Sequence, residues 1–178
     1  MKLVPWVPTP KTIIDDILRI AGLKPGDVFY DLGCGDGRVL LEAARKYKVR
    51  AVGIEIDPGL CRTARETAAK EGLDHLVEVV QSDFREVELS DATVVYMYLL
   101  TSVNRMLREK LSRELKAGTR VVTLDFPIPE WKPVVVERVW DGARFREVYL
   151  YIVGVSDAHR RPSSSVTSLF RGSGRRYY

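Results

Sequence analysis

The segment Asp31-Leu32-Gly33-Cys34-Gly35-Asp36-Gly37 lies directly after the apolar run Val28-Phe29-Tyr30 and directly before a helical pattern that begins at Arg38. Its glycines stand at every second position, which allows positive φ angles and leaves no Cβ between the backbone and a ligand. The segment therefore predicts a strand, a glycine loop and the start of a helix, with a ligand bound against the loop.

Strand and helix patterns extend outward from this loop. An extended, proline-rich arm (residues 1–10) comes first, because its alternating prolines remove amide donors, and a short amphipathic helix follows with Thr9 as its expected N-cap. Beyond the loop, apolar strands and amphipathic helices alternate as far as residue 126. A hairpin over residues 134–153 then turns at Asp141-Gly142.

This order of elements predicts an α/β fold: a doubly wound, Rossmann-like, seven-stranded, mostly parallel sheet with a C-terminal antiparallel hairpin. A chain of 178 residues with 46% apolar composition suits one domain, which we expect to span residues 1–153. Ligands of such sheets bind outside the carboxyl ends of the strands, beside the first strand. The residues at the strand ends are therefore the candidates for a binding site.

Those residues predict a nucleoside site. Glu55 ends the second strand 18 residues after Gly37, about where an acid accepts both hydroxyls of a ribose. Asp83, after the third strand, could accept a hydrogen bond from an exocyclic amine, while Phe84 and Ile56 could enclose an aromatic base. The structural alternatives are an ordinary acid at the end of a strand for Glu55 and a loop or helix cap for Asp83.

The glycine spacing narrows the choice of nucleoside. It is G-x-G-x-G, whereas a nicotinamide-binding loop has G-x-G-x-x-G, and no Gly-Lys-Ser/Thr follows, which excludes an ATP-type P-loop. Asp31 and Asp36 place negative charge beside the loop, where it would repel a pyrophosphate and attract an ammonium and a sulfonium. The predicted ligand is S-adenosyl-L-methionine, with S-adenosyl-L-homocysteine as the product.

The segment 31–37 with Glu55 and Asp83 resembles motif I and the next two loops of class I S-adenosylmethionine-dependent methyltransferases. Segments 4–10, 30–38, 92–101 and 148–151 resemble the small archaeal broad-specificity protein-lysine methyltransferases. The resemblance implies methyl transfer to lysine ε-amines of many proteins, and it places Thr9 near the cofactor. The predicted cofactor-binding residues are Thr9, Asp31, Gly33, Cys34, Gly35, Gly37, Glu55, Ile56, Asp83, Phe84 and Tyr96.

An aromatic channel is the predicted path of the acceptor lysine. Trp6, Tyr98 and Phe126 would form it, and desolvation there would favour the neutral amine over the ammonium. Tyr96 and Tyr98 alternate on the expected fourth strand and so point the same way, and one or both can instead fill the core. Trp6 can equally be a packing anchor or part of a lid.

Neither a metal nor a membrane is expected. Cys34, Cys61 and the two histidines lack the spacing of a zinc site, and a set of Asp83, Asn104 and Asp125 has little support from spacing. No apolar run approaches the roughly 20 residues of a membrane span, and the N-terminus lacks a signal-peptide pattern. We therefore expect a cytoplasmic protein.

The basic charge lies in the C-terminal tail (residues 154–178), which holds five arginines and one acid, whereas residues 1–153 carry 23 basic and 23 acidic groups. Its serines and glycines predict a flexible segment that could contact nucleic acid or an acidic partner, or could have no dedicated partner. The alternatives for the whole chain are an RNA or small-molecule methyltransferase and a non-catalytic protein that binds cofactor and nucleic acid.

Overall fold

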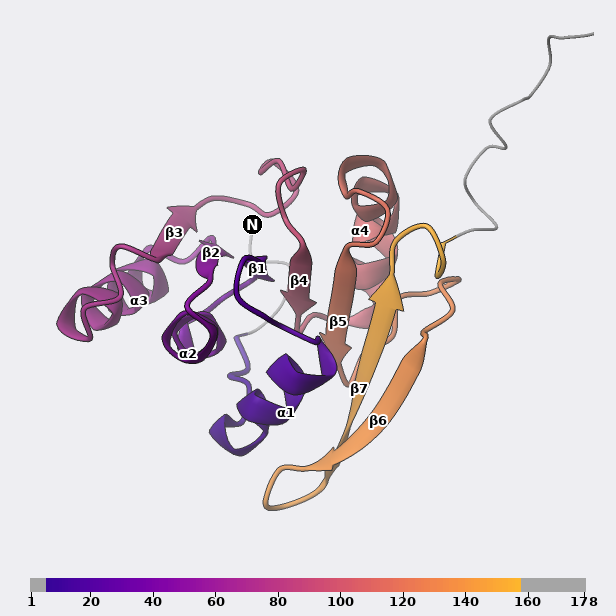
Figure 1. Ribbon diagram of the computed structural model, residues 1–178, viewed down its shortest axis with the longest axis horizontal. Helices are drawn as coiled ribbons and strands as arrows, with labels where there is room; N and C mark the ends of the chain where they lie inside the picture. Colours follow the sequence, from indigo (N-terminus) through magenta and orange to yellow (C-terminus); the bar gives the residue numbers. More distant parts are fainter. Residues whose placement is uncertain (1–5, 158–178) are drawn as a thin grey trace, which may run out of the picture.

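The computed structural model describes residues 6–157, which form a sheet with helices on both faces (Figure 1). The strands are β1 (Val28–Leu32), β2 (Arg50–Glu55), β3 (Val77–Gln81), β4 (Val94–Met97), β5 (Arg120–Leu124), β6 (Val135–Trp140) and β7 (Phe145–Ile152). The helices are the 3-10 turn η1 (Lys11–Ile13), α1 (Ile14–Ile20), α2 (Arg38–Tyr47), α3 (Pro58–Lys70) and α4 (Thr101–Glu114).

The sheet has seven strands, the predicted number, and their order is β3-β2-β1-β4-β5-β7-β6. Strands β1 to β5 are parallel to one another, and β7 is antiparallel to both of its neighbours. The strand order reverses between β1 and β4, so the loop after β1 opens at the point where α/β sheets bind ligands.

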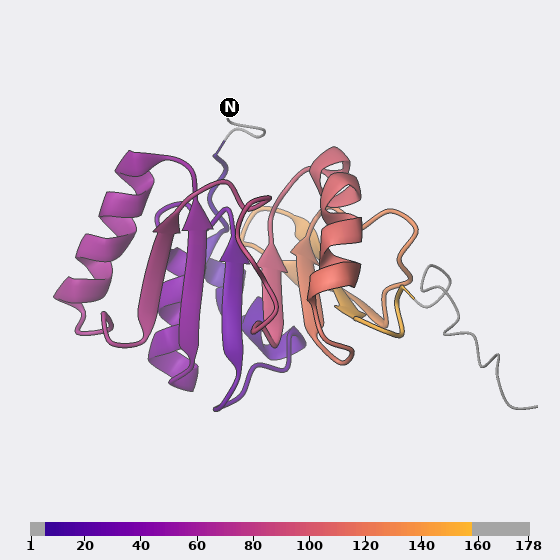
Figure 2. The same ribbon diagram turned by 90° about the horizontal axis from the view of Figure 1, so that it is seen from above.

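Two apolar cores lie on opposite faces of the sheet. One joins α1, α2 and α3 to the sheet, and the other joins α4 to it. Figure 2 views the sheet face-on, with α4 in front and α1 behind. The central strands β1, β4 and β5 are buried along almost their whole length, because both of their faces are covered.

The two expected helix caps differ in outcome. The Asp57 carboxylate caps α3 by accepting hydrogen bonds from the amides of Gly59 and Leu60. The Thr9 cap is wrong: Pro10 occupies the cap position, and the Thr9 hydroxyl shares a 2.8 Å hydrogen bond with the hydroxyl of Tyr96. A buried tyrosine hydroxyl needs such a partner.

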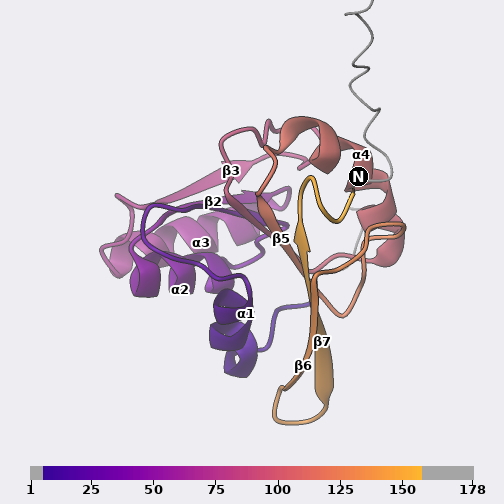
Figure 3. The same cartoon turned by 45° about the vertical axis from the view of Figure 1, so that its right-hand side comes forward.

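The β6–β7 hairpin extends beyond the rest of the sheet (Figure 3). The last rung between β5 and β7 joins Leu124 to Val148, whereas β6 and β7 pair for three further rungs, up to Trp140 and Phe145. The carboxylate of Asp141 closes the turn by accepting hydrogen bonds from the amides of the two residues that precede β7. The hairpin turn therefore lies past the carboxyl ends of the parallel strands.

Residues 154–157, which we expect to begin the tail, pack against the domain. Asp157 is buried and accepts hydrogen bonds from the amide of Gly154 at 2.6 Å and the hydroxyl of Ser112 at 2.8 Å. The rest of the tail, with its predicted contacts to nucleic acid or an acidic partner, lies outside the described residues. Among residues 6–157, each helix is too short or too polar to cross a bilayer.

Candidate active site

The glycine loop after β1 has the backbone that its sequence predicts. Gly33, Gly35 and Gly37 have φ angles of 83°, 56° and 82°. The amides of Gly33 and Cys34 donate to the carbonyl of Ile54 on β2, at 2.8 and 3.1 Å. The loop therefore turns sharply across the end of the sheet before α2 begins.

A cleft opens over this loop. Nine of the eleven predicted cofactor residues line it, as do Trp6 and Tyr98 of the predicted channel. The other two, Gly35 and Gly37, shape the loop from outside the cleft lining. The cleft is also lined by Asp36, whose charge the sequence places beside the loop, and by five residues outside the predicted site: Val7, Pro8, Arg38, Val39 and Leu99.

Asp31 is the most unusual group in the cleft. Its side chain is buried, and within the described part of the chain no donor or cation pairs with its carboxylate. Burial raises the pKa of Asp31 well above its ordinary value, and the nearby carboxylates of Glu55 and Asp36 raise it further. A ligand ammonium would offset both effects, so the residue fits the amino group of S-adenosylmethionine.

The Glu55 carboxylate is held in one orientation at the end of β2. One oxygen accepts a 3.0 Å hydrogen bond from the amide of Gly35, and the other accepts 2.9 Å bonds from the amides of Ile56 and Asp57. A carboxylate oxygen can accept more than one hydrogen bond, so these contacts leave capacity for hydroxyl donors. The buried group therefore suits ribose recognition as well as stabilisation of the loop.

Asp83 lies where either of its two expected roles is open to it. It lines the cleft, but its carboxylate also accepts hydrogen bonds from the amide and guanidinium of Arg85. The hydrogen bond from the Arg85 side chain lowers the pKa of Asp83. The structure thus supports the loop-cap interpretation directly, and hydrogen bonding to an exocyclic amine stays a prediction.

The N-terminal arm is held across the cleft. The carbonyl of Thr9 accepts a 3.2 Å hydrogen bond from Arg38, which is itself paired with Asp36 in the glycine loop. Trp6 lies against the loop so closely that a Cβ added to Gly35 would stand 2.3 Å from the indole Nε1. The arm and the loop therefore enclose the cleft together.

Two glycine substitutions should distinguish the contact of the loop with Trp6 from its packing against α3. In Gly35→Ala the new methyl meets a partly exposed indole that can move, so we expect weaker cofactor binding and a loss of only about 1 kcal/mol in the free energy of unfolding. In Gly37→Ala it would stand 2.9 Å from the buried Cβ of Ala64, and we expect a loss of about 2–3 kcal/mol.

Thermal denaturation and calorimetric titration with S-adenosylmethionine check this pair. Trp6→Ala should restore cofactor affinity in Gly35→Ala and leave Gly37→Ala unchanged. Equal loss of stability in the two glycine variants would contradict the interpretation.

Tyr98 lies just beyond the end of β4, so it does not alternate with Tyr96 on a strand as expected. Tyr96 is fully buried, whereas Tyr98 is half-buried at the edge of the cleft. Phe126 stacks on Tyr98, with ring centroids 6.1 Å apart, but it does not line the cleft. The three-residue channel stays a prediction: β5 ends at Leu124, the chain turns at Asp125 with a φ of 59°, and Phe126 follows this turn next to Tyr98.

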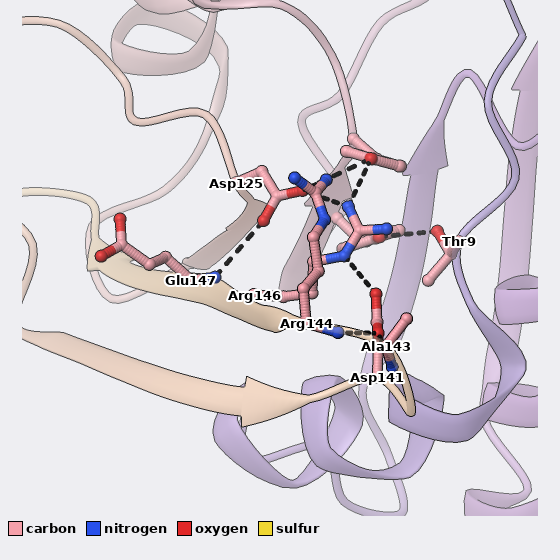
Figure 4. A network of polar contacts seen from close by, with 9 residues as sticks. Thr9, Asp125, Asp141, Ala143, Arg144, Arg146 and Glu147 are labelled. Atoms are coloured by element: carbon pink, nitrogen blue, oxygen red, sulfur yellow. Dashed lines mark hydrogen bonds and ion pairs between the residues drawn. The ribbon is translucent and has the colours of Figure 1, made fainter.

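A polar network in the hairpin links Arg146 to Asp125 and Asp141 (Figure 4). Arg146 lies between Asp125 and Asp141, with 2.5 Å contacts to both carboxylates, and it donates a 3.0 Å hydrogen bond to the Tyr98 hydroxyl. The hydrogen bond from Arg146 lowers the pKa of Asp141 to about 2. Sequence reasoning missed Arg146, because nothing local to a hairpin strand indicates a partner 48 residues away.

The described residues contain no group of three or more His, Cys, Asp or Glu side chains that could hold a metal ion. The Asn104 amide instead donates to the carbonyls of Phe126 and Pro127. Cys34 lines the cleft, and burial raises the pKa of its thiol well above the ordinary value, with Asp31 and Glu55 adding to the shift. A reactive thiolate is therefore disfavoured there.

Residues 31–135 match the family model of the ANTKMT methyltransferase domain. A protein-lysine N-methyltransferase of Saccharolobus islandicus is 47% identical over 85% of this chain and 94% of its own length. The chain belongs to the ANTKMT methyltransferase family. It is an enzyme of the S-adenosylmethionine-dependent class, as the cleft chemistry indicates.

Two further relatives extend the comparison. The adenine nucleotide translocase lysine N-methyltransferase of Mus musculus is 37% identical over 77% of this chain, which covers 62% of that protein. A crystal structure named as an RNA methyltransferase from Salinibacter ruber, in complex with S-adenosyl-L-homocysteine, is 45% identical with a TM-score of 0.78. That match covers 83% of this chain and 94% of the other, so the cofactor assignment has both sequence and structural support.

Proposed function

We propose that this ANTKMT-family enzyme transfers a methyl group from S-adenosylmethionine to the ε-amine of lysine side chains in proteins, over a broad range of substrates. The observation that carries the proposal is the 47% identity to an archaeal protein-lysine N-methyltransferase over nearly the full length of that protein. The mouse relative, which is also a lysine N-methyltransferase by name, supports the same chemistry.

The cleft edge suits the acceptor. Bound S-adenosylmethionine supplies a methyl group activated by a sulfonium, so the chain has mainly to align a neutral amine with it. The Tyr98 hydroxyl accepts from Arg146 and lies 3.4 Å from the Asp125 carboxylate, which leaves its ring as the surface that faces the cleft. An aromatic wall of Tyr98 and Trp6 would desolvate the lysine and favour loss of its proton to water.

Methylation of RNA is the second candidate, because the Salinibacter ruber structure carries that name. The sequence at the end of β4, Tyr96-Met97-Tyr98-Leu99, lacks the Asn-Pro-Pro-Tyr type of motif that suits methylation of an exocyclic amine on a base. This difference favours the lysine acceptor.

Incubation of the purified enzyme with methyl-labelled S-adenosylmethionine and cell lysate, with and without ribonuclease, tests the proposal. We expect label on protein in both samples, and mass spectrometry should locate it on lysine. Label that disappears with ribonuclease would instead support the RNA acceptor. Absence of label, in a protein that binds the cofactor by calorimetry, would support a binding protein without catalysis.

Three expectations from the sequence stay proposals. They are a cytoplasmic location, a flexible tail, and contact of that tail with nucleic acid or an acidic partner. The lysate experiment repeated with a variant that lacks residues 158–178, after its thermal stability has been compared with that of the full chain, measures what the tail contributes to acceptor choice.

A further inference from the structure

The β6–β7 hairpin presents one face beside the cleft. Beyond the last residue of β5, Leu124, two rungs of the hairpin place Arg138 opposite Glu147 and Trp140 opposite Phe145. These four side chains share one face because side chains alternate along a strand, and we call them the hairpin face. The hairpin extends past the rest of the sheet at this end (Figure 3).

Large aromatic groups are exposed on the hairpin face. Trp140 and Phe145 are each 55% exposed, and their rings meet edge to face with centroids 5.1 Å apart. The Arg138 guanidinium lies 4.7 Å from the centre of the Phe145 ring. Exposed aromatic side chains beside an arginine are typical of protein-binding surfaces.

The hairpin face continues directly to the methyl-transfer edge. A hollow beside it is lined by Asp125, Phe126, Arg138, Arg144, Phe145 and Glu147. Phe126 stacks on Tyr98, and Tyr98 lines the cofactor cleft. One pair of stacked rings therefore separates the hollow from the cleft.

The charges in the hollow favour an acidic guest. The Asp125 carboxylate is held by Arg146, and Glu147 accepts a hydrogen bond from Tyr149. Arg138 has no ion pair with a carboxylate among residues 6–157, and the 65% exposed Arg144 forms a long ion pair, at 3.5 Å, with the Asp125 carboxylate that Arg146 also holds. One unpaired guanidinium group, of Arg138, and one exposed group held only by a long ion pair, of Arg144, are thus available to bind a carboxylate of a partner.

We infer that the hairpin face binds the acceptor protein next to its target lysine, and that Arg138 and Arg144 select an acidic residue there. The inference rests on the proposed lysine methylation. The apolar rings would contact the flanking chain of the acceptor, while the two arginines would pair with its carboxylate. The enzyme would then accept proteins of many shapes and prefer those with an acidic residue beside the target lysine.

Two synthetic peptides test the inference. They share one central lysine and differ only in whether glutamate or glutamine stands on both sides of it. One exposed charge pair changes an equilibrium by roughly two- to fivefold. We therefore expect the kcat/KM of the full-length enzyme to be about three- to tenfold higher on the glutamate peptide, through a lower KM and not a higher kcat. The preference should shrink as salt is raised.

The variant Arg138→Gln/Arg144→Gln should lose this preference and keep wild-type thermal stability and cofactor affinity. Arg113→Gln, at a 72% exposed arginine near the end of α4, is the matched control and should keep the preference. Equal kcat/KM on both peptides in the wild type, or a preference that survives in the double variant, would overturn the inference.

Other outcomes are equally decisive. Sedimentation that shows a wild-type dimer and a monomeric double variant would assign the hairpin face to a second copy of the chain. RNA that competes with the peptide only when both arginines are present would assign the face to nucleic acid. Failure of the wild type to methylate either peptide or any lysate protein would remove the proposed function itself, which separates the two failures.

Discussion

Asp31→Asn should weaken S-adenosylmethionine binding by about 10- to 100-fold and make the ligand-free protein more stable. The substitution keeps the shape of the side chain and removes the charge that would pair with the ligand ammonium, and a hydrogen bond to a charged group contributes roughly 1.5–3 kcal/mol. Without ligand the same charge is buried beside Glu55 and Asp36 with no donor in the described structure. Its removal should therefore raise the free energy of unfolding by about 1–3 kcal/mol.

The difference in stability between the wild type and Asp31→Asn should depend on pH. The folded pKa of Asp31 lies above its ordinary value of 3.8, so the folded protein retains a proton that the unfolded chain releases. The contribution of Asp31 to wild-type stability is therefore lost as pH rises from 3.8 through the raised pKa, and the asparagine variant escapes this loss. The difference between the two proteins should grow over that interval and then level off.

Calorimetric titration and thermal denaturation over a series of pH values measure both effects. Asp74→Asn, at an exposed acid after α3, is the control and should change neither quantity. Wild-type cofactor affinity in Asp31→Asn would exclude Asp31 from the cofactor site, and loss of stability would contradict its description as an unpaired buried charge.

Tyr98→Ala should lower turnover by about 10- to 100-fold and change the cofactor Kd by less than about threefold. Loss of the ring widens the edge where the acceptor amine must be aligned, and small misplacements at this step reduce rates by up to roughly 100-fold. Tyr98→Phe keeps the ring and its stacking on Phe126, and it loses only the contacts with Arg146 and Asp125. It should therefore retain most of the turnover.

Single-turnover kinetics with a protein substrate measure the effect on turnover, and calorimetric titration measures the effect on the cofactor Kd. Unchanged turnover in Tyr98→Ala would remove Tyr98 from the acceptor site. A cofactor Kd raised as much as turnover is lowered would place the residue in cofactor binding instead.

Much of the site could be predicted because its residues follow the strands directly. Asp31 and Glu55 stand at the ends of β1 and β2, and parallel strands bring their carboxyl ends to one edge of the sheet. The positive φ angles of the loop follow from the glycines themselves. A local pattern was sufficient in each case.

Contacts between distant segments could not be predicted in this way. Gly53 stands in a buried strand, and only the packing explains it, since a Cβ there would lie 2.6 Å from the Cys34 sulfur. Thr9 looks like a helix cap along the chain, but it bonds to Tyr96, 87 residues away. The stacking of Phe126 on Tyr98 depends on the turn at Asp125, which no local pattern indicates.

The sequence by itself thus determined the sheet, the glycine loop and the chemistry of the cofactor, because strand periodicity, glycine spacing and acids at strand ends are local properties. Only the tertiary structure decided how the acceptor edge is built. There the arm bonds to β4 through Thr9 and Tyr96, and the hairpin bonds to Tyr98 through Arg146. The energy of those contacts depends on partners that no local pattern specifies.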